Sequence, residues 1–461
     1  MRSSKCTLVG RARSSCISKW PQNTAMCLSQ APICKLCEIH LIDQSLRVPS
    51  GLGFGICCRL IDEFLATRPS AEDLTLIFTT RSTKKGSDTL KSLQTHLAEH
   101  GPRSSRVHFR PVNVELTNLL SVKALARKLL NEVDLPKLDA VILNAGIAGT
   151  IGINFPAAIW QILTENAAAV TWPRFKLTAV GSLVEPQLDG GVAEPPLGQV
   201  FCANVFGHYM LSHWLMRLLR KCPTEKPGRV IWISSIEGSD HHFDPNDLQG
   251  LKSPTAYEHS KRLTDLLVLT ATGQAATGAS VQDFIAVQNV TDDVGIGPRP
   301  EIWAAHPGIV ATSIVPLPPV LMSAWVGVAY VMRWIGSPWH TNTAYLGAIS
   351  ASWLALASSS EVQHKQCSGI AKWGSCVDRA GNARVEKTDV VGWGVDGSGK
   401  PIKETWWGGG WGRMIGATDA TKEDVEGFVE QGARVWREME ELRLEWEARI
   451  EKYEKNQHRQ R

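Results

Sequence analysis

Apolar and polar positions alternate along the middle of the chain in a way that predicts strands separated by helices. Runs rich in strand-forming residues occupy 74–79, 106–112, 138–143, 229–234 and 301–305. Helical spacing occupies the stretches between them, at 84–99, 117–132, 198–220 and 255–271. Because continuously apolar strands linked by helices form parallel sheets covered on both faces, we predict an α/β fold with a doubly wound, Rossmann-type parallel sheet. It would be a single domain with long insertions at 147–197 and 273–299.

The two ends of the chain differ from this middle part. Residues 1–37 contain no Asp or Glu but several Lys and Arg and many Ser, a composition that resembles a transit peptide. We expect 1–49 to be an atypical leader, 50–360 the main domain and 361–461 a C-terminal extension. Apolar residues recur between charges from Lys422 onward, which predicts a helix laid along its own domain, with a partner-binding coiled coil as the alternative.

Two uncharged stretches bear on membranes. Residues 314–332 carry no charge, but Pro316, Pro318 and Pro319 leave only about 320–335 as a helix, and 341–358 is a second uncharged run. Both are shorter than a confident membrane span. We interpret them as helices of a substrate pocket or a membrane surface, with buried core helices as the alternative.

Composition excludes several classes of protein. With 43% hydrophobic and 20% charged residues the chain can bury a sizeable core. A net charge of +4 without a dense basic stripe argues against a dedicated nucleic-acid binder, and eleven cysteines in 461 residues are too few for a disulfide scaffold. No metal is expected, because His208, His241, His242 and His259 match no common ligand spacing.

Candidate binding residues lie where the predicted strands end. Gly51-Leu52-Gly53 opens a helix, and glycines there let the backbone approach a pyrophosphate. Arg81, with Lys84 nearby, suits a 2′-phosphate and favours NADPH over NADH. Asn144-Ala145-Gly146 ends another strand with small residues that can pass close to a flat cofactor.

The most specific signal is Tyr257 followed four residues later by Lys261, downstream of a strand that ends in Ser234-Ser235. Two residues that are four positions apart on a helix lie on the same face, so the Lys261 ammonium can favour the ionised form of the Tyr257 phenol. A free phenol has a pKa of about 10, too high for efficient proton exchange near neutral pH. The pattern therefore indicates a proton donor to a reacting carbonyl.

Together these motifs resemble the short-chain dehydrogenase/reductase family over about residues 50–350. Stretches 202–209, 230–235, 246–249 and 256–265 are similar to fungal 3-keto-steroid reductases of ergosterol synthesis. The resemblance implies NADPH-dependent reduction of a 3-keto sterol to the 3β-alcohol during sterol C-4 demethylation. It also implies an endoplasmic reticulum or lipid-droplet setting at a membrane surface, among the other C-4 demethylation enzymes and oxidosqualene cyclase.

The resemblance also implies a role for each matching residue. Tyr257 would protonate the ketone oxygen, and Lys261 would lower the pKa of Tyr257 and bind the nicotinamide ribose. Ser235 would hold the carbonyl, and Asn204 would anchor a water that links Lys261 to solvent. The cofactor would contact Gly51, Leu52, Gly53, Thr80, Arg81, Lys84, Glu115, Asn144, Ala145, Gly146, Tyr257, Lys261, Pro307, Gly308, Ile309, Val310 and Thr312.

The chain departs from the family at its first strand and glycine turn. Leu46, Arg47 and Pro49 stand where the family has Thr, Gly and Asn, and 36–46 is interrupted by polar residues and predicts a poor buried strand. Either the first 49 residues are misassigned or cofactor binding is impaired. Two alternative functions stay open: reduction of another lipid or secondary-metabolite ketone, and a non-catalytic membrane scaffold.

Overall fold

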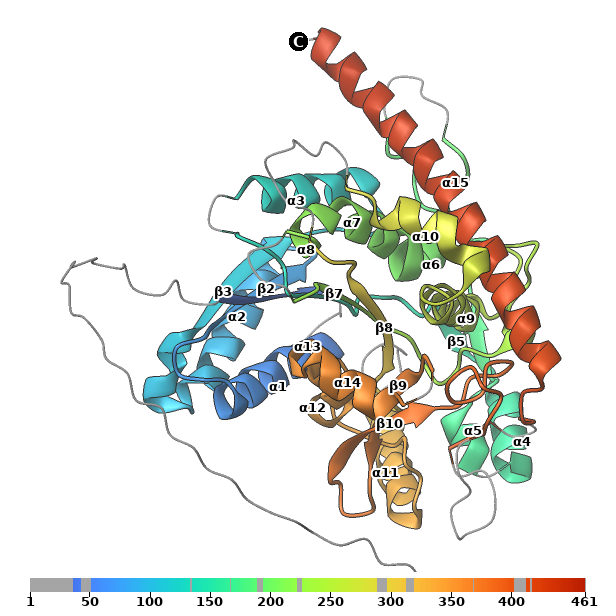
Figure 1. The fold of residues 1–461 in the computed structure, drawn as a ribbon. Helices are drawn as coiled ribbons and strands as arrows, with labels where there is room; N and C mark the ends of the chain where they lie inside the picture. The colour runs from blue at the N-terminus through green and yellow to red at the C-terminus, as the bar shows by residue number, and fades with distance from the viewer. Residues whose placement is uncertain are drawn as a thin grey trace, which may run out of the picture. The chain divides into compact units, whose positions relative to one another are not determined.

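An eight-stranded sheet forms the centre of the fold in the computed structural model (Figure 1). The structure describes residues 36–42, 51–132, 135–165, 167–188, 194–221, 226–287, 297–311, 319–367, 369–401, 412–414 and 417–460. The strands are ordered β10-β9-β8-β7-β4-β1-β2-β3, and every neighbouring pair is parallel except β10 with β9. The bounds are β1 Leu36–Ile42, β2 Asp73–Thr80, β3 Val107–Asn113, β4 Ala140–Leu143, β7 Arg229–Ile233, β8 Glu301–His306, β9 Lys372–Val377 and β10 Ala383–Thr388. The order β3-β2-β1-β4-β7-β8 is that of a doubly wound Rossmann-type sheet, as the sequence predicts.

The first strand departs from the expectation. Leu36–Ile42, predicted to be a poor strand, pairs in parallel with β2 on one side and with β4 on the other. A central strand satisfies the backbone groups of both neighbours, and this gain outweighs the weak local preference of a segment that contains Glu38 and His40. The turn that follows it, including Leu46, Arg47 and Pro49, lies outside the described residues.

Helices cover both faces of the sheet (Figure 1). One hydrophobic cluster packs α3, the helical run from α6 to α8, α9 and α10 against the sheet, and a second packs α1, α2 and α13 against the opposite face. The bounds are α1 Leu52–Thr67, α2 Thr83–Ala98, α3 Leu119–Asn131, α6 Gln199–Phe201, α7 Gly207–Trp214, α8 Met216–Leu219, α9 Ala256–Leu269, α10 Gly278–Ile285, α13 Ile349–Leu356 and α14 Ser359–Gln366. Polar caps begin α2 and α3, where Ser82 and Asn118 accept bonds from backbone N–H groups of the first turn.

The insertion at 147–197 forms a small subdomain beside the sheet. It contains the two-stranded antiparallel pair β5 (Thr150–Ile153) and β6 (Lys176–Thr178), with helices α4 (Phe155–Glu165) and α5 (Ala167–Thr171) between them. Large apolar side chains on α4 are exposed, among them Trp160 and Leu163. The insertion therefore brings an apolar surface and, through β6, one lysine close to the sheet.

The C-terminal helix α15 (Lys422–Gln460) lies along the chain's own domain, next to α9 and α10 (Figure 1). Its buried stripe includes Trp436, Met439, Trp446 and Ile450. The indole of Trp436 donates a hydrogen bond to the carbonyl of Leu267 at 3.0 Å. The prediction of a helix packed on its own domain is thus confirmed.

The two uncharged stretches behave differently. Helix α11 (Pro319–Ile335) exposes much of its apolar surface, whereas 341–358 forms α12 (Ala344–Gly347) and the buried α13. The alternative of a buried core helix is therefore correct for α13 and wrong for α11. Within the described ranges, every helix is too short or too polar to cross a bilayer.

Candidate active site

Asn204 and the strand end after β4 are tied together by a distorted helix. The π-helical turn η2 (Cys202–Phe206) interrupts the run from α6 to α7, as such turns often do at functional sites. Asn204 Oδ1 accepts from the Ile147 N–H at 2.7 Å, and its Nδ2 donates to Ser260 Oγ at 3.0 Å. A Cβ on Gly146 would lie only 2.9 Å from Asn204 Oδ1, so the turn requires a very small residue there.

The structure brings Ser235, Tyr257 and Lys261 to one place at the carboxyl ends of β4 and β7. Tyr257 lies in the first turn of α9, and Ser235, which follows β7, is close enough to its phenol to lower the pKa of Tyr257. The Lys261 ammonium lies 5.4 Å from the centroid of the Tyr257 ring. The predicted sharing of one helix face is therefore present, with Ser235 as the third member of the group.

Burial, rather than Lys261, dominates the electrostatics of the tyrosine. Burial is the largest cause that raises the pKa of Tyr257, and the charge of Glu237 raises it further. The charge of Lys176 opposes these two effects, and the neighbouring Ser235 also lowers the pKa of Tyr257. The expectation that Lys261 sets the acidity of the phenol overlooked Lys176, whose Nζ lies 5.5 Å from the ring centroid.

Lys261 is held deep in the protein. Its Nζ donates to the Ile233 carbonyl at 2.8 Å, and burial lowers its pKa to about 8, with Asp265 opposing and Lys372 adding to the shift. Lys372 Nζ is ion-paired with Asp265 Oδ2 at 2.6 Å and also donates to the Ser235 carbonyl at 2.5 Å. The backbone of Ser235 is thereby fixed from β9.

Sequence reasoning missed Lys176, Glu237, Asp265 and Lys372. Asp265 had a signal, since it lies eight residues after Tyr257 and so two helical turns along the same face. The signal for Lys372 was weaker: it is the charged residue of an otherwise uncharged strand. Lys176 had none, because only the tertiary packing of the insertion brings β6 to the catalytic helix.

The start of α1 and the end of β4 offer groups that fit a dinucleotide. Gly51 caps α1 without a side-chain hydrogen bond, so the N–H groups of its first turn, including those of Leu52 and Gly53, are available to a phosphate. Asn144 Oδ1 is buried and has no hydrogen-bond partner among the described residues. A buried acceptor of this kind is satisfied when a bound group donates to it.

The other predicted cofactor residues flank this position. Thr80 ends β2 and is buried, Arg81 is half-buried and Lys84 is exposed, as suits contacts with an adenosine phosphate. Glu115 Oε1 accepts from the backbone N–H and the hydroxyl of Thr117, so its carboxylate is already engaged by its own loop.

The loop after β8 is rigid. Gly308 has φ +70°, and a Cβ there would lie 2.3 Å from the Trp339 carbonyl, so only glycine fits. The Ile309 N–H donates to the same carbonyl at 2.7 Å, and Val310 bridges to Asn342. Pro307 to Val310 are half-buried beside this loop, while the predicted contact Thr312 lies outside the described residues.

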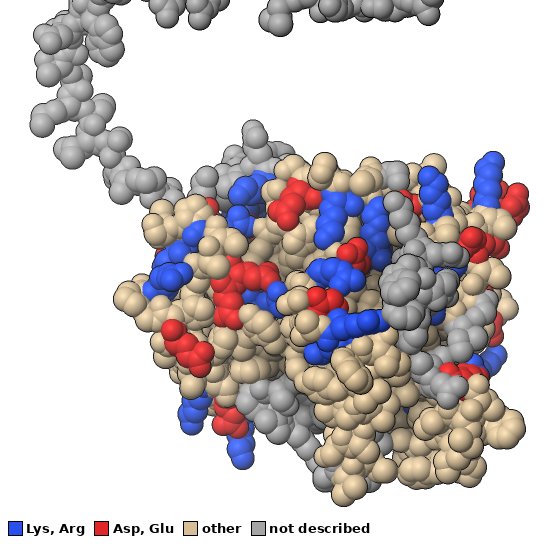
Figure 2. All heavy atoms as spheres, turned by 90° about the horizontal axis from the view of Figure 1, so that it is seen from below, with Lys and Arg blue, Asp and Glu red and all other residues tan. Residues whose placement is uncertain are grey.

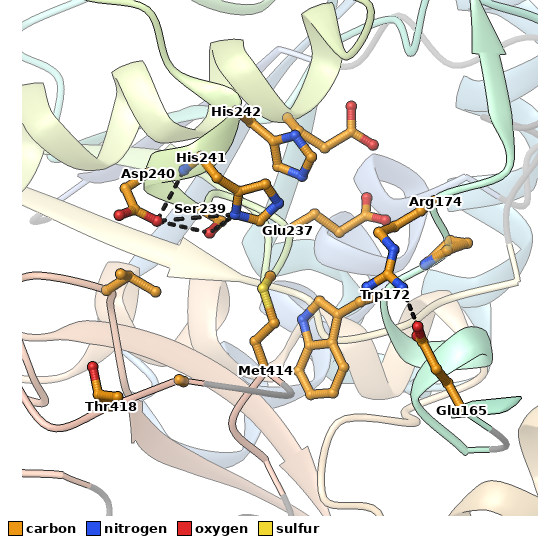
Figure 3. Close-up of a pocket in the computed structure, with 14 residues that line it drawn as sticks. Glu165, Trp172, Arg174, Glu237, Ser239, Asp240, His241, His242, Met414 and Thr418 are labelled. Carbon is orange, nitrogen blue, oxygen red and sulfur yellow. Dashed lines mark hydrogen bonds and ion pairs between the residues drawn. The ribbon is translucent and has the colours of Figure 1, made fainter. Parts of the chain in front are cut away.

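A side pocket of about 290 Å³ opens beside Glu237 and Glu258 (Figure 3). Charged and aromatic side chains line it, and Figure 3 shows Glu237 between His242 and Trp172. The other lining residues include Glu165, Arg174, Asp240, His241, Glu258 and Met414.

One group of potential metal ligands is present among the residues that the structure describes, away from the four histidines considered above. Asp62 on α1 accepts from His96 Nε2 at 2.7 Å and from His100 Nε2 at 2.8 Å, and all three ligand atoms lie within 4.8 Å. The tyrosine hydroxyl of Tyr345 donates to the other oxygen of Asp62 at 2.6 Å. The three groups satisfy one another by hydrogen bonds and do not touch the catalytic residues.

Comparison with known proteins gives close relatives. The chain is 42% identical over 431 residues to the 3-keto-steroid reductase erg27 of Aspergillus fumigatus, covering 88% of this chain and 94% of that protein. Proteins of the same name from Gibberella zeae and Schizosaccharomyces pombe are 39% and 31% identical, and the matches cover 92% and 88% of their lengths. No family model matches the sequence.

Among solved structures, a short-chain type dehydrogenase/reductase from Mycobacterium ulcerans is similar over 70% of this chain and 85% of its own, with 15% identity and a TM-score of 0.40. A TM-score this low carries no weight, and the fold rests on the strand order of this chain. The identity to the three fungal proteins over nearly their whole lengths is decisive: this chain belongs to the family of 3-keto-steroid reductases.

Proposed function

We propose that this chain reduces a 3-keto sterol to the 3β-alcohol with NADPH, during sterol C-4 demethylation in ergosterol synthesis. The observation that carries the proposal is the position of Tyr257, which lies beside Ser235 and has the Lys261 ammonium 5.4 Å from its ring centroid. Relatives that share 42% and 39% of its residues are named 3-keto-steroid reductases.

Each residue contributes one step to the reduction. Bound NADPH supplies the hydride for the carbonyl carbon. Ser235 donates a hydrogen bond to the carbonyl oxygen, and Tyr257 donates the proton that turns the developing oxyanion into the alcohol. Lys261 places a positive charge beside the phenol, where tyrosinate forms when the proton leaves.

The residues of this chain fit the cofactor. The first turn of α1 after Gly51 would bind the pyrophosphate, and the unpaired amide oxygen of Asn144 would accept from the bound molecule. Arg81 and Lys84 provide cations for a 2′-phosphate, which favours NADPH over NADH. Lys261 and the loop Pro307–Val310 would hold the nicotinamide end.

The test is NADPH oxidation by the purified full chain with a 4-methyl-3-keto sterol. Tyr257→Phe removes the proton donor and keeps the ring, so kcat should fall by about 10² to 10⁴ while NADPH binding stays intact. Full activity in Tyr257→Phe would contradict the proposal. Equal or faster reduction of retinoid or fatty-acyl ketones by the wild type would instead favour the other lipid-ketone function.

A non-catalytic scaffold predicts a different result in the same assay. Such a chain would bind neither NADPH nor a nicotinamide analogue, because the scaffold idea rests on a damaged cofactor turn. Tight NADPH binding, followed by quenching of tryptophan fluorescence, would exclude it.

We further propose that the chain works at the surface of the endoplasmic reticulum or of lipid droplets. Helices α4 and α11 expose apolar side chains, and both contact α5. Figure 2, which views the molecule from the α11 side, shows few charged side chains in its lower part and many across its middle. An exposed apolar surface of this kind fits a lipid interface from which a sterol can enter.

The resemblance to the sterol branch also motivates a proposal about partners. At such a membrane the chain would lie among the other C-4 demethylation enzymes and oxidosqualene cyclase. Cross-linking in membranes that contain these enzymes tests this, and recovery of the chain without any of them would contradict it.

A further inference from the structure

Two histidines and an aspartate lie together where the end of α2 packs beside α1, on the opposite face of the sheet from α9 (Figure 1). His96 lies in the last turn of α2, and His100 lies four residues later, in the turn that follows the helix. Their Nε2 atoms are 2.7 and 2.8 Å from the same oxygen, Asp62 Oδ1. We call these three residues the aspartate–histidine cluster, and its three ligand atoms lie within 4.8 Å of one another.

The cluster has the chemical composition of a transition-metal site and nearly the right size. Two imidazole nitrogens with one carboxylate oxygen suit zinc and similar divalent ions, whereas Mg²⁺ and Ca²⁺ prefer oxygen ligands. Tetrahedral zinc, with bonds of about 2.0 to 2.2 Å, places neighbouring ligand atoms about 3.3 Å apart. Asp62 Oδ1 is closer than that to both nitrogens, so a small outward rotation of the carboxylate would admit the ion. Three protein ligands leave the fourth position for water.

The carboxylate of the cluster is already oriented by a neighbour. The hydroxyl of Tyr345 on α12 donates to Asp62 Oδ2 at 2.6 Å, while Oδ1 faces the histidines. Burial, and then the hydrogen bond and charge of Asp62, raise the pKa of Tyr345, so the hydroxyl keeps the proton that it donates. Carboxylates that bind metals commonly have such an outer hydrogen bond, which fixes their orientation. The cluster therefore has an outer shell as well as ligands.

The charges around the cluster also favour a cation. The thiol of Cys58, one turn before Asp62 on α1, has its pKa raised to about 12 by burial and then by the charges of Asp62 and Glu99. Arg59, the nearest basic residue in the sequence, is ion-paired with Glu63 at 2.6 Å. The negative field of Asp62 and Glu99 is one that a bound divalent ion would reduce.

We propose that the aspartate–histidine cluster is a binding site for a divalent transition metal, and that Zn²⁺ is the ion it takes. Binding exchanges the two hydrogen bonds between histidine and aspartate for three bonds to the metal. Each imidazole binds through Nε2 and carries its proton on Nδ1, where water can accept it because the His96 and His100 side chains are 23% and 24% exposed. The ion links α1 to the end of α2. Since the cluster does not touch the catalytic residues, zinc binding is independent of the reduction proposed above.

Calorimetric titration of the untagged, full-length chain with zinc chloride tests the site. Accessible thiols are first blocked with iodoacetamide, because the cysteines within the first 37 residues and the exposed Cys367 are potential zinc ligands themselves. We expect one zinc ion per chain with a dissociation constant in the micromolar range. Magnesium chloride at the same concentrations should give no binding heat.

Three variants assign the binding to the cluster. His96→Gln removes one ligand, although its amide can still donate to Asp62, so zinc affinity should fall by about a hundredfold or more while the fold is kept. Tyr345→Phe removes only the outer hydrogen bond and should weaken binding by about tenfold. His108→Gln is the matched control, because His108 also faces an aspartate, with Nε2 3.9 Å from Asp73 Oδ2, but lies outside the cluster. It should bind zinc as the wild type does.

Two further measurements use the folded state and the wild-type chain. Zinc should raise the Tm of the wild type and of His108→Gln but not that of His96→Gln, because an ion bound by the folded chain stabilises it. Zinc should also protect His96 and His100 of the wild type from diethylpyrocarbonate, as mapped by mass spectrometry. This second readout needs no variant, so it stands even if His96→Gln fails to fold.

Three outcomes would overturn the site: wild-type chain that does not bind zinc saturably, equal zinc affinity in His96→Gln and the wild type, or no protection of the two histidines. A chain that binds zinc as expected but never oxidises NADPH with the sterol would support the metal site and contradict only the proposed reduction.

Discussion

Helices α11 and α13 have similar sequences, but one is largely exposed and the other is largely buried. Both are apolar and lack acidic residues, and they are separated by only thirteen residues. Leu354 of α13 is fully buried in the cluster that also contains α1, while Val320 and Trp334 of α11 are 80% and 74% exposed. Hydrophobicity alone therefore does not tell a core helix from a surface helix in this chain.

The difference between the two helices follows from their neighbours. The last turn of α13 is capped by Arg229, whose Nη1 donates to the carbonyls of Leu354 and Ala357 at 2.6 Å each. Arg333, the charged residue of α11, turns inward, and its Nε donates to the His340 carbonyl at 2.9 Å. Most of α13 is buried, whereas α11 is anchored at its end and exposes much of its apolar surface. The second arrangement is that expected of a helix lying on a lipid surface.

The largest effect should come from truncating the core helix. Leu354→Ala removes a fully buried side chain and should lower the free energy of unfolding by about 3 kcal/mol. Val331→Ala on α11 makes a similar truncation at an exposed position and should change it by less than about 0.5 kcal/mol. Urea unfolding followed by tryptophan fluorescence measures both. Similar losses in the two variants would break the distinction between the helices.

A smaller effect should arise at the junction between the helices. His340 is buried in the loop that joins α11 to α12, and burial, with the charge of Arg333, lowers its pKa to about 4. An unfolded chain has a histidine pKa of about 6.5, so the unfolded state takes up the proton first as the pH falls. The stabilisation is present above pH 6.5, and roughly 2.5 kcal/mol of it is lost between about pH 6.5 and 4.

Unfolding measured across that range checks this pH dependence. His340→Gln should flatten the fall in stability, whereas His364→Gln on the exposed face of α14 should leave it unchanged. An equally steep fall in His340→Gln would show that the junction does not titrate as its burial requires.

The same contrast shows how far the sequence could predict the fold. The strand runs at 74–79 and 229–234 match β2 and β7, because a buried parallel strand is apolar without interruption. Strand β1 is not predicted by its own sequence, because its stability comes from pairing with two neighbouring strands, and the local pattern of residues does not show that pairing. For the same reason, the sequence alone does not decide whether α11 and α13 are buried or exposed.

The residues of the active site also differ in how well the sequence predicts them. Tyr257 and Lys261 were predictable, because residues four apart on a helix share a face whatever surrounds it. Lys176 was not, because it reaches the site from a strand of an insertion eighty-one positions before Tyr257. Spacing within one element can be read from sequence, while contacts between distant elements depend on the fold.

The smallest effect should appear at the membrane. Trp334→Ser removes an indole that is 74% exposed on α11, so the free energy of unfolding should hardly change. An indole that enters a lipid interface contributes about 1.5 kcal/mol or more, so binding to neutral phospholipid vesicles should weaken by roughly tenfold. Leu444→Ser removes an exposed apolar side chain from α15 instead and should leave vesicle binding intact. Flotation of the full-length variants with vesicles measures both effects. An equal loss of binding in the two variants would mean that any exposed apolar side chain drives binding. Helix α11 would then be no different from the rest of the surface.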